Sequence, residues 1–126
     1  MKKIIDTPNA PAAIGPYSQA IEVNGTLYIS GQIPVNPATG QIDATDIAEQ
    51  TEQVFKNIEA ILTEAGYTFS DVVKHTVFLT NISYFGAMNE VYKSVYQSGY
   101  YPARSAFAVK DLPAGALVEI ETIAVK

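Results

Sequence analysis

Apolar residues recur along this chain at two spacings, one typical of helices and the other typical of strands. Between residues 46 and 65 they return every three or four positions, which predicts an amphipathic helix that stops at Gly66. A second helix is predicted to run to about Gln97, with Phe85, Met88, Val91, Tyr92 and Val95 on its apolar face. Candidate N-caps are Asp43 or Thr45 for the first helix and Asn81 or Ser83 for the second.

Six shorter runs of apolar and β-branched residues predict strands. They are Ile4–Ile5, Ala20–Val23, Leu27–Ser30, Val72–Leu79, Arg104–Val109 and Leu117–Val125. Asn24-Gly25, between the second and third runs, is the strongest short hairpin signal in the chain. A short Pro/Gly loop separates the last two runs, so we expect these to form a hairpin as well. Gly31 and Gly40 are expected to serve turn geometry.

The order β-β-β-α-β-α-β-β favours one α+β domain over residues 1–126, with both helices on one face of a mixed sheet. Alternation in the last strand agrees, because its odd and even positions differ in polarity. The residues expected to point toward the helices are Val118, Ile120, Thr122 and Ala124. Those expected to point away from the helices are Glu119, Glu121, Ile123 and Val125. In the run Val72–Leu79 both faces are largely apolar, and Val73 is assigned to the face of Val77 and Leu79. A helix-free face that stays partly apolar needs another cover, so we expect a cyclic oligomer.

Composition narrows the chemistry. The chain of 126 residues has a formal net charge of −5, from 8 Lys+Arg against 13 Asp+Glu, and its lysines are scattered, which argues against nucleic-acid binding. It has no Cys and one His, which excludes thiolate chemistry and a metal site built from several His of one chain. Asp6 and Pro8 interrupt the apolar segment (h-region) that a signal peptide would need near the N-terminus. No apolar run is long enough to cross a bilayer. We therefore expect a cytoplasmic protein without membrane contact.

Arg104 is the only arginine and the best candidate to bind an acidic small molecule, because a guanidinium fits a carboxylate with two parallel hydrogen bonds. If the last two strands form a hairpin centred near Pro113, Arg104 lies opposite Glu121 and Ala106 opposite Glu119. All four side chains would then share the helix-free face. From these residues alone, a structural ion pair between Arg104 and Glu121 is an equally good interpretation.

Five segments together resemble the Rid family, the reactive intermediate/imine deaminases that are also called YjgF proteins. They are Ala13–Gln19, with the sequence AIGPYSQ, Ser30–Pro34, with SGQIP, the strand Val72–Leu79, Pro102–Ser105, with PARS, and Val118–Glu121, with VEIE. The resemblance spans nearly the whole chain without a large insertion and is closest to the deaminase branch.

The resemblance implies a chorismate-mutase-like (YjgF-like) α+β fold and a homotrimer whose sheets face inward, with sites at the subunit clefts. It implies a 2-iminobutanoate/2-iminopropanoate deaminase, which hydrolyses imines and enamines such as 2-aminoacrylate to 2-oxo acids and ammonia. The expected partners are small 2-imino and 2-oxo carboxylic acids, without a metal or an organic cofactor.

The resemblance also assigns roles to matching positions. Arg104 would bind the substrate carboxylate and Glu119 would position or activate the hydrolytic water. The remaining pocket residues would be Tyr17, Ser30, Asn89 and the backbone of Ala106. Many members have Cys where this chain has Ala106, so the chemistry here would proceed without a thiol.

Several of these residues have a structural alternative. Tyr17 could anchor a turn, Ser30 could satisfy nearby backbone, and Glu121 could exchange roles with Glu119. His75, the only histidine, is better interpreted as a hydrogen-bonded structural residue than as a general base. The competing function is a trimer that binds small carboxylates without turnover. The acidic balance and the lone His argue against the ribonuclease activity reported in the family.

Overall fold

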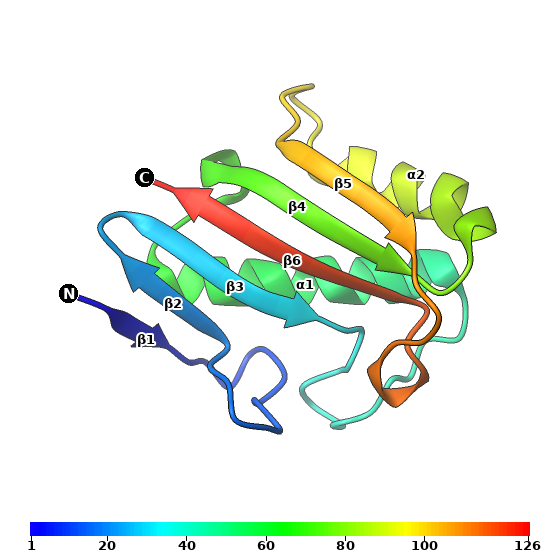
Figure 1. The fold of residues 1–126 in the computed structure, drawn as a ribbon, viewed down its shortest axis with the longest axis horizontal. Coiled ribbons are helices and arrows are strands. Elements are labelled where there is room, and N and C mark those ends of the chain that lie inside the picture. Colours follow the sequence, from blue (N-terminus) through cyan, green and yellow to red (C-terminus); the bar gives the residue numbers. More distant parts are fainter.

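The computed structural model describes all 126 residues as a six-stranded sheet with two helices on one face (Figure 1). The strands are β1 Lys3–Ile5, β2 Ala20–Val23, β3 Thr26–Gln32, β4 Val72–Leu79, β5 Ala103–Ala108 and β6 Val118–Val125, and the helices are α1 Ile47–Ala65 and α2 Phe85–Val95. Three short 3₁₀ turns lie at Phe69–Asp71, Ile82–Tyr84 and Pro113–Gly115. The expected element order and α+β class are confirmed.

The strand order across the sheet is β1-β2-β3-β6-β4-β5, with β4 and β5 parallel and every other pair antiparallel. The sheet is therefore mixed, as expected. Asn24-Gly25 forms the tight turn between β2 and β3, and both of its residues have positive φ, as a hairpin turn of this kind requires.

The expected hairpin of the last two strands is wrong, because β4 lies between β5 and β6 (Figure 1). His75 of β4 is the partner of Arg104 on one side and of Thr122 on the other. Parallel strands need a crossover connection, and α2 supplies it between β4 and β5. The chain from β5 must then pass beyond β4 before it returns as β6, which a hairpin cannot do.

Capping side chains and a glycine define the helix ends, and some of the predicted caps were wrong. Asp46, and neither Asp43 nor Thr45, caps α1, since its carboxylate accepts a hydrogen bond from the backbone N–H of Glu49. Gly66 ends the helix in the left-handed conformation, at φ 83°. Asn81 caps the 3₁₀ turn before α2, and α2 itself stops at Val95, two residues before the expected end.

The core fills the space between the sheet and the helices. It contains Val54, Ile58 and Ile61 of α1, Met88 and Tyr92 of α2, and Val118, Ile120 and Ala124 of the central strand β6. The predicted alternation of β6 is confirmed by its burial pattern. In β4 the assignment of Val73 was wrong: an irregularity between Val72 and Lys74 buries Val72 and exposes Val73.

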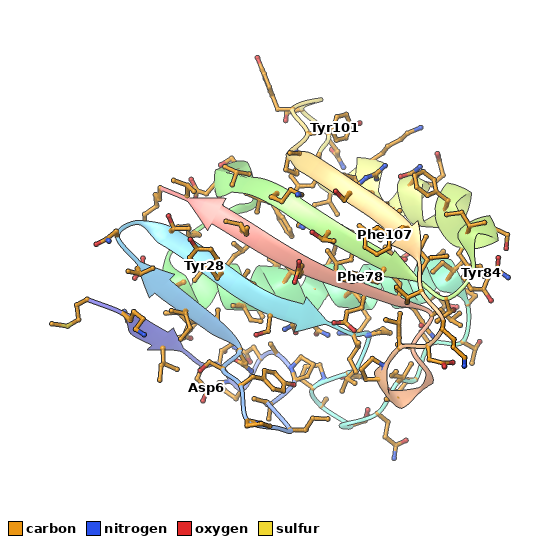
Figure 2. All side chains as sticks on the ribbon, viewed as in Figure 1. Asp6, Tyr28, Phe78, Tyr84, Tyr101 and Phe107 are labelled. Carbon is orange, nitrogen blue, oxygen red and sulfur yellow. The ribbon has the colours of Figure 1, made fainter.

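The helix-free face of the sheet is partly apolar and uncovered in the single chain. Figure 2 shows Tyr28, Phe78 and Phe107 on this face, from strands β3, β4 and β5. The rings of Phe78 and Phe107 pack edge to face with centroids 5.3 Å apart, while Tyr28 and Phe107 remain 49% and 45% exposed. We call this surface the open face. Neither helix is long and apolar enough to cross a membrane.

Candidate active site

Arg104 lies on the helix side of the edge strand β5, where it contacts α2. Its Nη1 donates a hydrogen bond to Oδ1 of Asn89 at 2.6 Å. Its guanidinium carbon lies 4.7 Å from the ring centre of Tyr92 and 5.2 Å from that of Phe85. The only ion pair in the protein joins Lys93 to Glu90, so the alternative of an ion pair between Arg104 and a glutamate is wrong. The guanidinium thus has no carboxylate partner within the chain.

A cleft of about 420 Å³ opens beside this cation. Its lining consists of Asn89, Tyr92, Lys93, Tyr101, Pro102 and Arg104. Lys93 of the lining is paired with Glu90, whereas Arg104 has no carboxylate partner, and the aromatic walls lower the local dielectric. Such a cleft favours a small anion. We call Arg104, Asn89 and the wall around them the Arg104 half-site.

Glu119 lies on the open face and is partly buried. Burial, assisted by the neighbouring charge of Glu121, raises the pKa of its carboxyl above the ordinary value. Glu121 shares this face but is exposed to solvent. Of the two carboxylates, Glu119 therefore has the environment of a proton acceptor, because a base works best when its pKa is closer to neutrality.

Gly31 makes room for the Glu119 carboxylate, a role that the sequence did not reveal. Its φ is not positive, so the expected turn geometry was wrong, whereas Gly40 does have a positive φ, of 74°. A Cβ added to Gly31 would overlap with Oε2 of Glu119. The missing side chain thus gives the carboxylate its place against the backbone of β3. The predicted strand ended at Ser30, whereas β3 extends to Gln32, so Gly31 lies inside a strand, where a glycine often marks a close approach.

Tyr17 lies in the segment before β2, and Ser30 is the β3 residue that precedes Gly31. Tyr17 and Gly31 line one hollow of about 300 Å³. Tyr17 is 50% exposed, so it is not the buried anchor of the alternative interpretation. The hydroxyl of Ser30 donates to the carbonyl of Ser18 at 2.7 Å, which is the backbone role that its alternative expected. We call Glu119, Gly31 and Tyr17 the Glu119 half-site.

The two half-sites lie on opposite faces of the sheet, which corrects the expected shared face. Arg104 aligns with the buried His75 and Thr122, so it points toward the helices, and Ala106 is partly buried on the same side. Glu119 aligns with Phe78 and Phe107 on the open face. The error came from the expected hairpin register, because inserting β4 between the two strands changes which residues share a row.

His75 is a structural residue, as interpreted from the sequence. Its ring is buried, with Nδ1 2.9 Å from the hydroxyl of Thr122 and Nε2 2.6 Å from that of Tyr96. Burial lowers its pKa to about 4, so the imidazole is neutral at physiological pH. No cluster of three or more His, Cys, Asp or Glu side chains could hold a metal ion.

Comparison with known proteins agrees with the fold. Residues 7–126 match the endoribonuclease L-PSP family. A Bos taurus protein named 2-iminobutanoate/2-iminopropanoate deaminase is 52% identical over 126 residues, which are 100% of this chain and 91% of the relative. The Mus musculus protein of the same name is 49% identical over 100% of this chain and 93% of the relative.

Solved structures match equally well. A Rid family protein from Yersinia pestis superimposes with a TM-score of 0.97 at 53% identity, over 100% of both chains. TdcF from E. coli, solved with bound serine, gives a TM-score of 0.95 at 43% identity over 98% of each chain. This α+β chain therefore belongs to the endoribonuclease L-PSP family, also called the Rid or YjgF family, which confirms the resemblance seen in its motifs.

We predict that Gly31→Ala moves the Glu119 carboxylate without unfolding the protein. The added methyl meets only the end of a flexible side chain, so Glu119 should rotate toward solvent and its pKa should fall toward the ordinary value. Stability should change by no more than about 1 kcal/mol. Carboxyl NMR of Glu119 and thermal unfolding measure the two effects.

Gly40→Ala is the matched control for this substitution. Gly40 has positive φ and open space around it, so alanine should cost stability through backbone strain and leave the pKa of Glu119 unchanged. An unshifted Glu119 in Gly31→Ala would contradict the assigned role of Gly31.

We also predict that Glu119→Gln stabilises the protein at neutral pH. Because folding raises the pKa of Glu119, its stabilising contribution is complete below the unfolded pKa of about 4.3 and is lost as the pH rises through the folded pKa. The neutral amide removes this loss, so the variant should exceed the wild type in melting temperature at pH 8 and match it near pH 4. Thermal unfolding at one fixed protein concentration measures the difference.

The exposed Glu121 provides the control, since Glu121→Gln should shift the melting temperature less. A Glu119→Gln variant that is less stable than the wild type at pH 8 would show that a cation holds the carboxylate in its charged form.

Proposed function

We propose that this protein is a 2-iminobutanoate/2-iminopropanoate deaminase, which hydrolyses reactive 2-imino acids to 2-oxo acids and ammonia. Relatives with this name are 46–52% identical over the full chain. The observation that carries the proposal is Arg104, a permanent cation that lines a cleft and has no carboxylate partner. The cytoplasmic location of the protein remains a prediction.

The proposed reaction needs orientation and one proton acceptor. Arg104 holds the substrate carboxylate by two parallel hydrogen bonds. Water adds to the electrophilic carbon of the protonated imine, and Glu119 accepts the proton that this water loses. Glu119 returns its proton to the amine nitrogen of the tetrahedral adduct, ammonia leaves as the C–N bond breaks, and the hydroxyl proton passes to the Glu119 carboxylate as the C=O bond forms. Neither a metal nor an organic cofactor takes part in these steps.

Two copies of the chain would supply one site. Arg104 and Glu119 lie on opposite faces, and β4 separates their strands, so one copy cannot place both groups around a substrate this small. The partly apolar open face supports packing against further copies. We propose a homotrimer with its sheets facing inward and its sites between subunits. In this assembly Tyr17, Ser30 and Asn89 would line the pocket, and the backbone of Ala106 would contact the substrate nitrogen or its water.

Mixed oligomers of two inactive variants test the proposal. Arg104→Ala and Glu119→Gln should each lose hydrolysis of 2-aminoacrylate generated by a serine dehydratase, followed as imine loss with ammonia release. After unfolding and refolding as a 1:1 mixture, about a quarter of the sites combine an intact Arg104 with an intact Glu119 from different copies. About a quarter of wild-type activity should return.

A double variant that carries both substitutions in one chain, refolded with wild type, provides the control. In this second mixture, about a quarter of the sites consist of two wild-type copies. Absence of recovery in the first mixture, together with activity in the second, would show that one copy provides both groups. An inactive wild type would reject the deaminase assignment itself.

We predict that Asn89→Asp weakens carboxylate binding more than Asn89→Ala does. The aspartate would place a carboxylate of nearly the same shape beside Nη1 of Arg104 and neutralise the cation that the ligand needs. The alanine would remove one hydrogen bond but leave the charge. Calorimetric titration with 2-oxobutanoate should therefore rank the affinities as wild type, then Asn89→Ala, then Asn89→Asp. If Asn89→Ala bound 2-oxobutanoate more weakly than Asn89→Asp, the result would contradict binding through the charge of Arg104.

A binding protein without turnover is the second candidate, because TdcF was solved with bound serine. Both candidates need Arg104, and they differ in the handling of water. If Glu119→Gln loses turnover and still binds 2-oxobutanoate, the enzyme is supported. The ribonuclease activity in the family's name finds no support here, since the one histidine is buried and neutral.

A further inference from the structure

One face of α2 surrounds the Arg104 guanidinium. Phe85, Asn89 and Tyr92 follow the helical spacing i, i+4, i+7, so all three side chains point the same way. The amide accepts one N–H, and the two rings lie 5.2 Å and 4.7 Å from the guanidinium carbon. The cation is thus held by neutral groups only.

Tyr92 is the more rigid of the two rings. It is 4% exposed, and its ring meets His75 edge to face at 5.6 Å and stacks on Tyr101 at 6.3 Å, with the planes 27° apart. Phe55 closes a third side, at 5.7 Å. The hydroxyl of Tyr92 is buried and has no hydrogen-bond partner. The contacts that fix this residue are therefore those of its ring.

We propose that Tyr92 is a positioning residue for Arg104: the face of its ring fixes the guanidinium at the cleft without neutralising it. The proposal rests on the role of Arg104 in the proposed function. A ring face attracts a cation through its quadrupole, so it restricts Arg104 as a carboxylate would. Unlike a carboxylate, it leaves the positive charge available for the ligand. The long arginine side chain then loses little further freedom when the ligand binds.

Three variants separate the ring from the hydroxyl and from general packing. Tyr92→Leu removes the ring, and Tyr92→Phe keeps it. Phe55→Leu is the packing control: Phe55 is also 4% exposed, meets His75 at 5.6 Å and packs edge to face on Tyr92 at 5.7 Å, but makes no cation–π contact with Arg104.

Calorimetric titration with 2-oxobutanoate gives the first measurement. Tyr92→Leu should weaken binding about tenfold, within the range of a cation–π contact. Tyr92→Phe should bind like the wild type, and Phe55→Leu should lose stability while binding within about twofold of wild type. In turnover, Tyr92→Leu should raise KM more than it lowers kcat.

The second measurement does not depend on turnover. The chain has one arginine, so its Nε–H gives a single assignable NMR signal. The ring currents of Tyr92 and Phe85 should shift this signal upfield. Tyr92→Leu should move it toward the random-coil position, and Tyr92→Phe should restore it. This result stands whether or not the protein hydrolyses imines, so the two proposals can fail separately.

Three outcomes would overturn the proposal. Unchanged binding and an unchanged arginine signal in Tyr92→Leu would remove the role of the ring. Equal weakening in Phe55→Leu would reduce it to general packing. Equal weakening in Tyr92→Phe would transfer the role to the hydroxyl. If Tyr92→Leu does not fold, Phe85→Leu is the alternative variant, because it removes the other, less buried ring. Ring positioning would be contradicted if the arginine signal of the wild type already lay at the random-coil position and Phe85→Leu left it unmoved.

Discussion

The parallel pairing of β4 with β5 determines most of what is distinctive in this structure. A parallel pair cannot be closed by a tight turn, so the chain crosses over through α2. The crossover places α2 beside the edge strand β5 and brings Phe85, Asn89 and Tyr92 against Arg104. The same pairing requires β6 to enter on the other side of β4. The separation of Arg104 from Glu119 is a direct result.

The surroundings of Arg104 and Glu119 affect the charges of these two groups in opposite ways. Arg104 sits among neutral groups, an amide and two rings, so its charge is retained and its position is restricted. Glu119 is partly withdrawn from water and lies near the like charge of Glu121, so its ionised form is disfavoured. A ligand carboxylate needs the first environment, and a proton acceptor near neutrality needs the second. The environment of Arg104 depends on the helix face, since the rings that hold it belong to α2.

Local chemistry in the sequence was sufficient to predict the elements but not their neighbours. Helical periodicity located α1 and α2, Gly66 marked a helix end, and Asn24-Gly25 marked the turn between β2 and β3. The order of strands depends on contacts between distant segments, and the short distance between β5 and β6 in sequence was misleading. Arg104 stood out as the only arginine, and one assumed register placed it on the same face as Glu119; the family motifs then suggested roles for both residues. The role of Gly31 was missed because the carboxylate that it accommodates, that of Glu119, belongs to another strand, β6.

Within one chain, the sheet places Arg104 and Glu119 in contact with different segments. Substitutions in α2 reach the groups around Arg104, while substitutions at Gly31 reach the Glu119 carboxylate. Under the proposed function, a descendant of this chain could therefore change the acid that it recognises and keep its water chemistry, or do the reverse. On this proposal, ligand choice and reactivity would be separately heritable traits.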